Sequence, residues 1–375
     1  MSKTNPSDIV FSPGEIARIG NQSVKRRMES EFKGLPLFLP GLDLPRDYVW
    51  PDDEKELPKF FLKMRAGELT SVISRPGHGK TSWMMRWARE AAALFAELDR
   101  DKDERRCVVF VTYEQHVEDL HSFHAAAHSG VSITKMAEGA ITQDDYAKVV
   151  RASSERTTLP LWFLGFSEER RKARPVMTVS TLTDAILSIE DSTKGGVRWK
   201  PAAVCVDYLQ RMPFDGRVES KTIGTSAVLD QLKEMFLATN TVGMTGVQAK
   251  REVDSKPVEI PAMDDGQWSS NVEQTSDRII TLTKPSKYRR PGEEFYGVRV
   301  EGDNQLLVTV PKQKMGAGSW HRWVHFDPAF NRFEVIKDHS VDLANHKPSG
   351  PAYTNGNPQR VEAASAQWPE LDFEN

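Results

Sequence analysis

Short apolar runs alternate with longer mixed segments through the middle of the chain, from about residue 60 to residue 337. Apolar runs bounded by turn residues are typical of buried strands, whereas apolar residues that recur every three or four positions are typical of helices. Regular alternation of the two kinds of segment is the pattern of a parallel sheet covered by helices. The pattern therefore predicts an α/β fold with a mainly parallel central sheet.

The expected elements can be bounded from the same pattern. The strands are Leu69–Ser74, Cys107–Tyr113, Leu159–Phe166, Ala202–Val206, Val242–Val247, Arg278–Leu282, Gln305–Val310, Trp320–Phe326 and Arg332–Ile336. The last three are separated by turn residues, so we expect them to be antiparallel. The helices are Lys80–Leu98, Thr181–Ile189 and Ala227–Ala238. The mixed-charge run at 99–106 (DRDKDERR) predicts a solvated loop.

Two less regular segments flank this body. Residues 1–60 hold a basic stretch, Val24–Phe32, and then a Pro-rich segment in which Phe38, Leu42 and Trp50 are expected to pack against the body. Residues 338–375 are polar and rich in Pro, Gly and Asn, which predicts a disordered tail. We therefore expect an arm or linker at 1–60, one domain at 61–337 and a tail at 338–375.

Composition narrows the class of protein. The chain has 375 residues, of which 39% are hydrophobic and 27% charged. We therefore expect a soluble globular protein with a hydrophobic core, and wholesale disorder is excluded. No stretch approaches the ~20 apolar residues of a membrane span. The start of the chain lacks the pattern of a secretory signal, and so we expect a cytoplasmic protein. Cys107 and Cys205 lie in apolar runs and are too few for a disulfide framework or a zinc site.

The strongest local signal is the segment Ser74–Ser82, SRPGHGKTS, between an expected strand and an expected helix. Backbone N–H groups in such a loop point at phosphates, and Gly79 permits their close approach. Lys80 supplies charge to the β- and γ-phosphates, and the Thr81 hydroxyl ligates Mg²⁺. This arrangement is that of a P-loop, whose strict pattern is G-x-x-x-x-G-K-S/T, except that Ser74 replaces the first glycine. The predicted nucleotide-binding residues are Arg75, Pro76, Gly77, His78, Gly79, Lys80, Thr81 and Ser82.

Three further polar residues follow apolar strands. Glu114 comes after VVFVTY, where a carboxylate beside the P-loop can polarise the attacking water. Asp207 ends PAAVCVD, where a carboxylate can hold Mg²⁺. Gln248 ends VGMTGVQ, where an amide can contact the γ-phosphate. The alternatives are a surface glutamate, a helix-capping aspartate and a solvent-facing glutamine.

Two other clusters have an ordinary structural interpretation. His116, His121, His124 and His128 fall on one expected helix, where metal binding is one interpretation, but no carboxylate completes a recognised zinc pattern. The aromatic segment 161–166 (LWFLGF), with its tryptophan and two phenylalanines, presents rings that can stack on bases. We expect helix residues in the first case and a buried strand in the second.

The order of the motifs resembles the DnaB-type replicative helicases, which are RecA-like hexameric motors of helicase superfamily 4. The motifs RPGHGKT, TYEQ, VDYLQ, VQAKR, VEQTSD and PKQKMG follow one another between about Leu35 and Ile336. The DYLQ box and the EQ-x-x-D box are specific to this branch, whereas a P-loop (Walker A motif) alone is not. The resemblance implies a RecA-like P-loop NTPase fold, ATP and Mg²⁺ as ligands, and DNA helicase activity in replication.

The resemblance also implies a role for each motif residue. Lys80 and Thr81 bind ATP and Mg²⁺, Glu114 is the catalytic base, Asp207 is the Mg²⁺ carboxylate, and Gln248 senses the γ-phosphate. In this family a KQ-R segment reaches into the site of the neighbouring subunit.

Two features depart from the family. Lys312 matches the KQ-R segment, but Lys314 stands where the family usually has an arginine finger, which keeps the charge and loses the planar fork. The finger is therefore Lys312, Lys314 or another residue. About 60 residues precede the motor, too few for the family's collar domain, so we expect a short form. The stretch Val24–Phe32 is either a linker helix that docks on the next subunit or a solvated basic arm.

The net charge of −3 excludes attraction of nucleic acid by the whole surface, so DNA contacts must come from local basic loops. The candidates are the loops Arg211–Lys221 and Ala249–Lys256, which follow expected strands and in a hexameric ring would face the central channel. The alternative is that both are ordinary solvated loops. The predicted single-stranded DNA contacts are Arg211, Arg217, Lys221, Lys250, Arg251 and Lys256.

The expected partners are single-stranded DNA, further copies of the chain in a ring, and a loader or a primase. The expected origin is bacterial, plasmid or phage. The alternative function is a RecA-like ATPase without unwinding activity, whose nucleotide gates assembly with a partner, as in a loader, a recombination mediator or a defence component.

Overall fold

The computed structural model describes residues 12–29, 34–37, 63–156, 158–169, 176–190, 193–194, 196–214, 221–250, 260, 269–314 and 320–335. The strands are β1 (Leu69–Ser74), β2 (Glu104–His116), β3 (Leu161–Phe166), β4 (Thr193–Lys194), β5 (Val197–Asp207), β6 (Val242–Gln248), β7 (Arg278–Thr283), β8 (Glu294–Phe295), β9 (Val298–Arg299), β10 (Gln305–Gln313), β11 (Trp320–Asp327) and β12 (Arg332–Val335). The helices are α1 (Pro13–Glu29), α2 (Lys80–Leu98), α3 (Val117–Ser129), α4 (Ile133–Ala137), α5 (Gln143–Arg156), α6 (Val179–Glu190), α7 (Lys221–Ala238) and α8 (Ser269–Thr275).

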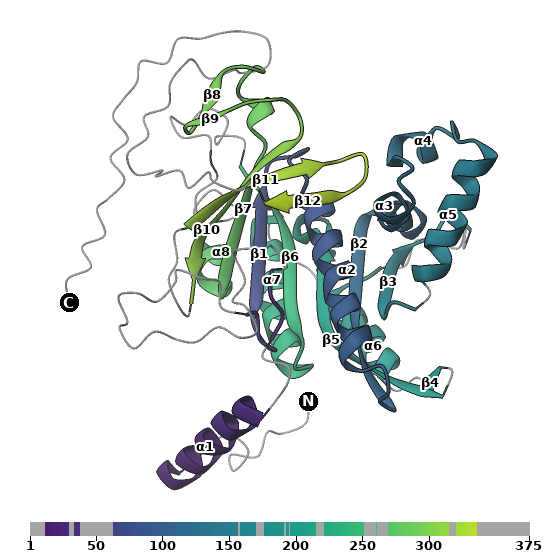
Figure 1. Ribbon diagram of the computed structural model, residues 1–375. Coiled ribbons are helices and arrows are strands. Elements are labelled where there is room, and N and C mark those ends of the chain that lie inside the picture. Colours follow the sequence, from purple (N-terminus) through teal and green to yellow (C-terminus); the bar gives the residue numbers. More distant parts are fainter. Residues whose placement is uncertain are drawn as a thin grey trace, which may run out of the picture.

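One ten-stranded sheet organises these elements, in the order β12-β11-β10-β7-β1-β6-β5-β2-β3, with β4 paired to β5 (Figure 1). The strands from β7 to β3 in this order are parallel to their neighbours, and β10, β11 and β12 are antiparallel. The predicted fold class, a mainly parallel sheet with antiparallel strands at its C-terminal edge, is confirmed. The parallel strands end at one edge of the sheet, so the residues that follow them lie together.

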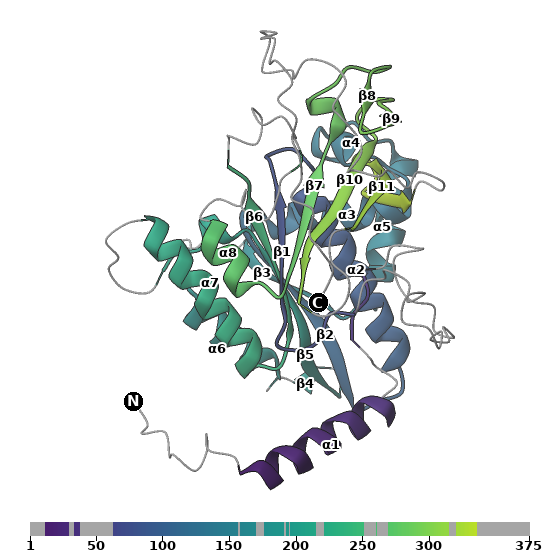
Figure 2. The same cartoon turned by 90° about the vertical axis from the view of Figure 1, so that its left-hand side faces the viewer.

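Two hydrophobic layers, one on each face of the sheet, account for the continuous apolar runs. Val108 and Phe110 of β2 pack with α2 on one face, whereas Val109 and Val111 pack with α6 and α7 on the other (Figure 2). Strands buried on both faces are apolar at every position rather than at alternate ones. The cysteines follow the same rule, since Cys107 and Cys205 are buried in opposite layers, and both are free thiols.

The prediction that residues 99–106 form a solvated loop is wrong. Asp99 is buried and accepts hydrogen bonds from the guanidinium of Arg106 at 2.7 Å, and β2 already begins at Glu104. This charged start of β2 pairs with the equally charged start of β5, where Glu104 forms ion pairs with Arg198 and Lys200. The strand extends beyond the apolar core, so no apolar run marks its beginning.

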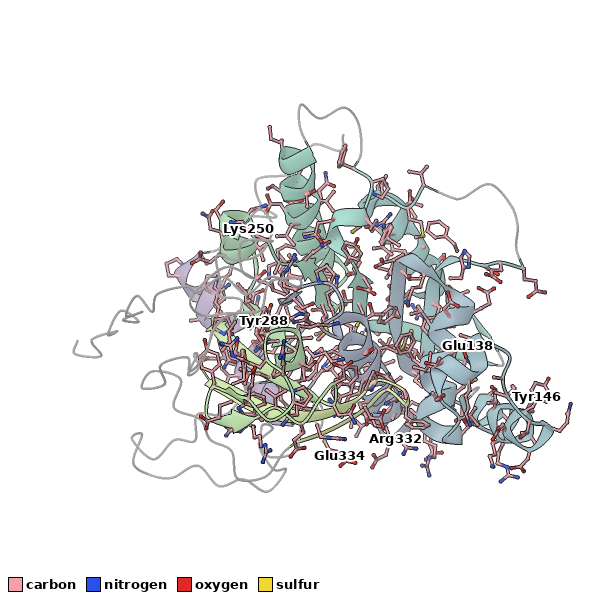
Figure 3. The ribbon with its side chains drawn as sticks, turned by 90° about the horizontal axis from the view of Figure 1, so that it is seen from above. Glu138, Tyr146, Lys250, Tyr288, Arg332 and Glu334 are labelled. Atoms are coloured by element: carbon pink, nitrogen blue, oxygen red, sulfur yellow. The ribbon has the colours of Figure 1, made fainter. Side chains whose placement is uncertain are left out.

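A helical segment, α3 to α5, follows β2 and stands at the side of the sheet. Tyr146 on α5 lies at the outer margin of the molecule (Figure 3) and is exposed. His116 ends β2 and does not lie in the helix, contrary to expectation, whereas His121, His124 and His128 lie in α3. His124 is buried and its ring stacks on that of His128 at 4.3 Å. The segment 161–166 forms the strand β3, as predicted, but only Leu161 is buried and the other residues are half-buried, because β3 lies at the edge of the sheet.

Helix α1 lies apart from the layered body in both cartoon views (Figures 1 and 2). Ser12 and Glu15 form a reciprocal capping box, with Ser12 N–H donating to Glu15 at 2.7 Å and Glu15 N–H donating to Ser12 Oγ at 3.3 Å. The basic stretch therefore lies, as far as Glu29, in a helix that begins well before Val24.

Phe38, Leu42, Trp50 and residues 338–375 lie outside the described residues. None of the helices within the described residues has the length and apolar character needed to cross a membrane.

Candidate active site

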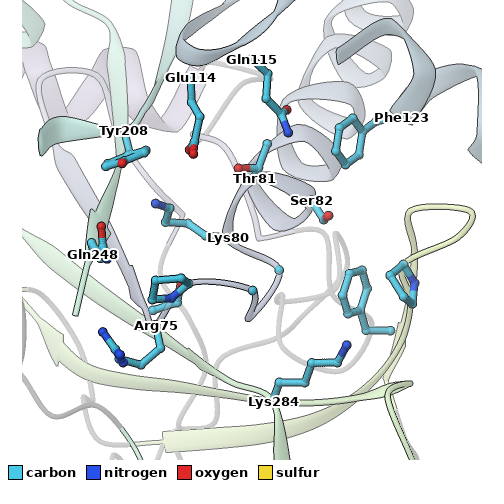
Figure 4. A pocket seen from close by; sticks show the side chains of 16 residues that line it. Arg75, Lys80, Thr81, Ser82, Glu114, Gln115, Phe123, Tyr208, Gln248 and Lys284 are labelled. Atoms are coloured by element: carbon cyan, nitrogen blue, oxygen red, sulfur yellow. The ribbon is translucent and has the colours of Figure 1, made fainter. Parts of the chain in front are cut away.

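A cleft of about 500 Å³ opens at the edge of the sheet where the parallel strands end (Figure 4). Its floor is the loop between β1 and α2, which carries the segment Ser74–Ser82. Seven of the eight predicted nucleotide-binding residues line it; His78 does not. The sequence also predicted Glu114 and Gln248, and both line the cleft. Further lining residues, which sequence reasoning missed, are Gln115, Phe123, Tyr208, Lys284, Phe326 and Pro328.

The loop is shaped by two glycines with left-handed backbone. Gly77 has φ of +79° and Gly79 has φ of +82°, a region that other residues rarely adopt. Gly79 precedes the first turn of α2, whose N–H groups have no partners within the helix. A Cβ atom on Gly79 would lie 3.0 Å from the ring of Phe326, so β11 packs directly on the loop. The free N–H groups make the floor of the cleft an anion site.

At the floor, the half-buried Lys80 and Thr81 contact Asp207, which is buried beneath them. Thr81 Oγ1 donates to Asp207 Oδ2 at 2.6 Å, and Lys80 Nζ lies 3.9 Å from Asp207 Oδ1. Burial lowers the pKa of Lys80 and raises the pKa of Asp207, and their mutual attraction opposes both shifts. Asp207 is 1% exposed, and its Oδ1 has no hydrogen-bond partner among the described residues.

The group of Lys80, Thr81 and Asp207 suits a divalent cation that is shared with a phosphate. No cluster of three or more metal-ligating side chains occurs in the described part of the chain. A hydroxyl, one carboxylate with an oxygen to spare and the phosphate oxygens of a nucleotide are the oxygen donors that Mg²⁺ prefers, because Mg²⁺ keeps most of its water shell. Thr81 and Asp207 therefore fit Mg²⁺, and by themselves they make no closed metal cage.

Two neighbours of Lys80 fix its position. The aromatic ring of Tyr208 faces the ammonium, with Nζ 4.0 Å from the ring centroid. On the other side, Gly246 leaves the space that the lysine stem occupies, since a Cβ atom there would lie 3.0 Å from Lys80 Cδ. Tyr208 belongs to the DYLQ box, so its place beside Asp207 could have been noticed in the sequence.

The two strand-end residues on the walls are Glu114 and Gln248. Glu114 is exposed to the cleft near the end of β2. Beside the larger effect of burial, its negative charge raises the pKa of both Lys80 and Asp207. The backbone of Gln248 is held by the amide of Gln210, whose Oε1 accepts from Gln248 N–H at 3.2 Å. The next residue of the chain is tied to the loop, because Arg75 donates to the Ala249 carbonyl at 3.2 Å.

The lysines of the PKQKMG motif lie at the opposite end of the sheet. Ser74 pairs with Leu282 at one end of β7, whereas Gln313 pairs with Arg278 at the other. Lys312 Nζ donates to the Glu273 carbonyl. The separation along β7 is roughly 10–15 Å at ~3.3 Å per residue, so neither lysine belongs to the cleft of its own chain.

Lys314 is held by an aspartate that has other partners. Lys314 Nζ lies 3.1 Å from Asp277 Oδ1, and its side chain is 71% exposed. Asp277 Oδ2 is already satisfied by Lys233 and by the N–H of Leu69 at 2.9 Å.

The predicted DNA contacts are only partly described. Arg211 is exposed and its Nε donates to the Tyr208 hydroxyl at 3.2 Å, which places it at the mouth of the cleft. Lys250 follows β6, and Lys221 begins α7. Arg217, Arg251 and Lys256 lie outside the described residues, as does the side chain of Lys221.

Comparison with known proteins places the chain among the DnaB-like helicase C-terminal domains. The family model for the DnaB-like helicase C-terminal domain matches residues 53–335. The replicative DNA helicase DnaC of Bacillus subtilis (strain 168) is 21% identical over 272 residues, which cover 71% of this chain and 52% of that protein. The replicative DNA helicase DnaB of Pasteurella multocida is 23% identical over 282 residues, which cover 73% and 53%. The chain thus spans about half the length of these relatives.

Solved structures share the fold. The ATPase domain of G40P matches with a TM-score of 0.66 at 18% identity, covering 87% of this chain and all of that one. A DnaB-like replicative helicase, solved in a study of its interactions with primase, matches with a TM-score of 0.62 at 18% identity, covering 87% and 67%. The fold class and the resemblance read from the motif order are both confirmed.

Proposed function

We propose that this chain, which belongs to the family of DnaB-like helicase C-terminal domains, is an ATP-driven motor that translocates on single-stranded DNA in replication. A nucleotide-binding site follows from the family and the fold. The observation that carries the proposal is the cleft itself, in which the P-loop after β1 meets the carboxylate of Glu114 from β2 and the amide of Gln248 from the neighbouring strand β6. Residues 61–337 are the motor in this proposal.

The phosphates of ATP are bound by the floor of the cleft. The N–H groups of Gly77 and of the residues from Gly79 to Ser82 cradle them, and Lys80 places its ammonium at the β- and γ-phosphates. Thr81 and Asp207 hold Mg²⁺, which neutralises phosphate charge when it is bound. The buried Asp207 carboxylate attracts the Lys80 ammonium at 3.9 Å, and this attraction opposes the lowering of the lysine pKa that burial causes.

Glu114 acts as the general base in this mechanism. Its carboxylate is exposed at the end of β2, where it can accept a proton from a water molecule that attacks the γ-phosphate. Gln248 contacts the γ-phosphate from the opposite wall. Because β6 continues directly into Ala249 and Lys250, a shift of Gln248 on loss of the phosphate would move the start of a candidate DNA loop.

The adenine base fits the far wall of the cleft. Phe326 presents an aromatic ring beside Gly79, and Lys284 lines the same wall. An aromatic face and a cation are both favourable neighbours for a purine ring. The sequence motifs gave no indication of this base-binding wall, since Lys284 follows β7 and Phe326 lies in β11.

The active site is shared between subunits in this proposal. Lys312 and Lys314 lie far from the cleft of their own chain, so they would serve the cleft of the next copy in a ring, a hexamer by family expectation. The attachment of Lys314 is weak, because an exposed ion pair contributes only ~0–1 kcal/mol. Repetition of the candidate DNA contacts around the ring would give a positive channel despite the acidic chain.

Partners and location follow the same proposal. Most of the described side chains of helix α1 are exposed, and the helix would be the linker that docks on the next subunit. A primase is a further candidate partner, because one structural neighbour was solved in a study of primase interactions; a loader is another. The proposed location is the cytoplasm of a bacterium, including one that carries a plasmid or a phage.

A strand-displacement assay tests the proposal. The purified chain is mixed with a forked DNA duplex, with and without ATP, and the Lys80→Ala variant is the matched control. ATP-dependent release of the labelled strand by the wild-type chain alone supports the motor. DNA-stimulated ATP hydrolysis without strand release would instead favour the second candidate, an ATPase that gates assembly with a partner. The substitution of Lys314 for an arginine finger is the observation that favours this candidate.

A further inference from the structure

His78 is the one predicted P-loop residue whose side chain points away from the cleft. It is only 3% exposed. Its Nδ1 accepts a hydrogen bond from the backbone N–H of Lys284 at 3.1 Å, so this ring nitrogen carries no proton. The ring also meets that of Tyr288 edge-on, with centroids 5.7 Å apart. One imidazole thus joins the phosphate loop to the segment that follows β7.

The segment on the other side of this contact is a compact turn. Residues Pro285–Lys287 form a single 3₁₀ turn after Lys284. Asp303 contacts the middle of the turn and the residue before it, since it accepts from Ser286 Oγ at 2.5 Å and lies 3.3 Å from Lys284 Nζ. The Lys284 side chain is 7% exposed and lines the cleft. The position of this side chain depends on where the backbone of Lys284 is held.

The turn is also anchored behind, in a separate apolar cluster. Tyr288 stacks on Phe295, and Phe295 meets Trp323 edge-on. These rings belong to a cluster that is distinct from the two layers of the main sheet. Trp323 lies in β11, the strand that also carries Phe326. Lys284 and the turn after it are thus anchored on this cluster, whereas Phe326 packs in a layer of the main sheet, where it stacks on Phe333. A hydrogen bond from the Lys284 backbone joins the anchored turn to the phosphate loop at His78.

We propose that His78 is a positioning residue that fixes the base-binding wall to the phosphate loop through the backbone of Lys284. The proposal rests on the proposed function, in which the wall contacts adenine. His78 makes no contact with the phosphates, which are bound by the N–H groups and Lys80 on the opposite side of the loop. Substitution of His78 should therefore weaken the contribution of the base to the affinity for ATP and leave the contribution of the phosphates unchanged.

Binding of two ligands separates these parts. The first is a non-hydrolysable ATP analogue with Mg²⁺, and the second is Mg²⁺–tripolyphosphate, which has no base. For His78→Ala we expect roughly tenfold weaker binding of the analogue, since a buried N–H loses its acceptor, and tripolyphosphate binding within about twofold of wild type. His78→Asn restores an acceptor near the position of Nδ1, whereas His78→Gln places it farther along the side chain. Rescue by Asn that exceeds rescue by Gln is expected.

A double variant tests whether His78 acts through Lys284. Lys284→Ala removes the side chain that the wall presents, so a second substitution, His78→Ala, should weaken analogue binding by less than about twofold more. In steady-state hydrolysis, His78→Ala should raise KM for ATP by about the same factor as the binding constant and change kcat by less.

Other results would contradict the role of His78, the route through Lys284 or the proposed function. Equal weakening of both ligands would mean that His78 supports the phosphate loop itself, and unchanged analogue binding would mean that it supports nothing at the site; either result overturns the proposal. Additive effects in the double variant overturn the route through Lys284. If His78→Ala does not fold, the Asn and Gln variants carry the same comparison. A wild-type chain that binds neither ligand refutes the proposed function instead.

Discussion

The position of Lys80 depends on a glycine in the neighbouring strand, and this dependence can be tested by adding one methyl group. Gly246 lies in β6, where an alanine Cβ would stand 3.0 Å from Lys80 Cδ and 3.1 Å from Asp207 Oδ1. Ordinary contacts between such atoms are about 3.5–4 Å. In Gly246→Ala the lysine and the aspartate must therefore separate from β6 by a few tenths of an ångström.

The expected effect is on catalysis rather than on folding. A misplacement of ~1 Å at a reacting centre costs about 10²-fold in rate, so a shift of a few tenths should lower kcat for ATP hydrolysis by about tenfold. Lys80 can bend away along its flexible stem, so the free energy of unfolding should change little. We expect a melting temperature within about 2 °C of wild type and a KM changed by less than about threefold.

Gly243 in the same strand provides the matched control. An alanine Cβ there would lie 2.2 Å from Cδ2 of the fully buried Phe236, far from the cleft. Overpacking of a core costs ~1–3 kcal/mol, so Gly243→Ala should melt several degrees lower and keep its kcat well below the melting transition. If Gly246→Ala hydrolyses ATP at the wild-type rate, Lys80 and Asp207 are not placed as the structure has them, and the derivation fails.

Three further outcomes follow from individual contacts. Lys80→Ala should abolish ATP hydrolysis and weaken nucleotide binding; near wild-type turnover would rule out the P-loop assignment. Glu114→Gln should bind ATP about normally and hydrolyse it at least ~100-fold more slowly, and a drop of only a few-fold would place the base elsewhere. Burial raises the pKa of Asp99, but hydrogen bonds from Arg106 and Lys102 outweigh it and lower the pKa from 3.8 to about 2. Asp99 therefore contributes about 2 kcal/mol above pH 4 that is lost as the pH falls through 2, so urea unfolding of wild type and Asp99→Asn should converge there; parallel curves would contradict the ion pair.

The sequence predicted the half of the cleft that comes from strand ends. In a parallel sheet each strand leads into the same edge, so an apolar run followed by one polar residue gives both the strand and the place of that residue. Glu114 and Gln248 could be assigned to one cleft for this reason alone, before any distance was known. Asp207 was found in the same way, although it lies beneath the floor of the cleft and not on its wall.

The base-binding wall could not be predicted, because no local pattern encodes it. Lys284 follows β7 and Phe326 lies in an antiparallel strand, and only the order of strands in the sheet brings them beside the phosphate loop. His78 shows a second limit. The P-loop pattern fixes which residues form the loop, but the direction of each side chain depends on what packs behind the loop, which for His78 is a turn more than 200 residues further along the chain.

The sheet topology requires that the PKQKMG lysines act, if they act in hydrolysis, on the cleft of another subunit, and a mixing experiment can test this. Lys314 stands at the end of the sheet opposite the cleft, so if it acts in hydrolysis it must act on a neighbouring subunit. Glu114→Gln subunits have an inactive cleft and an intact Lys314, and Lys314→Ala subunits have the reverse. Each should be nearly inactive alone, whereas a mixed ring contains some interfaces with both wild-type halves and should regain measurable ATP hydrolysis.

The control mixture combines Glu114→Gln with Lys80→Ala, in which every cleft carries a defect. It should regain nothing, so recovery that is specific to the first mixture cannot be an effect of co-assembly. If the first mixture also stays inactive while the rings demonstrably co-assemble, either Lys314 has no role across the interface or hydrolysis needs every site intact. Lys314→Arg then decides between them. A guanidinium binds two phosphate oxygens where an ammonium is a point charge, so a faster rate retains Lys314 as the finger, and an unchanged rate assigns the role to Lys312 or to another basic residue.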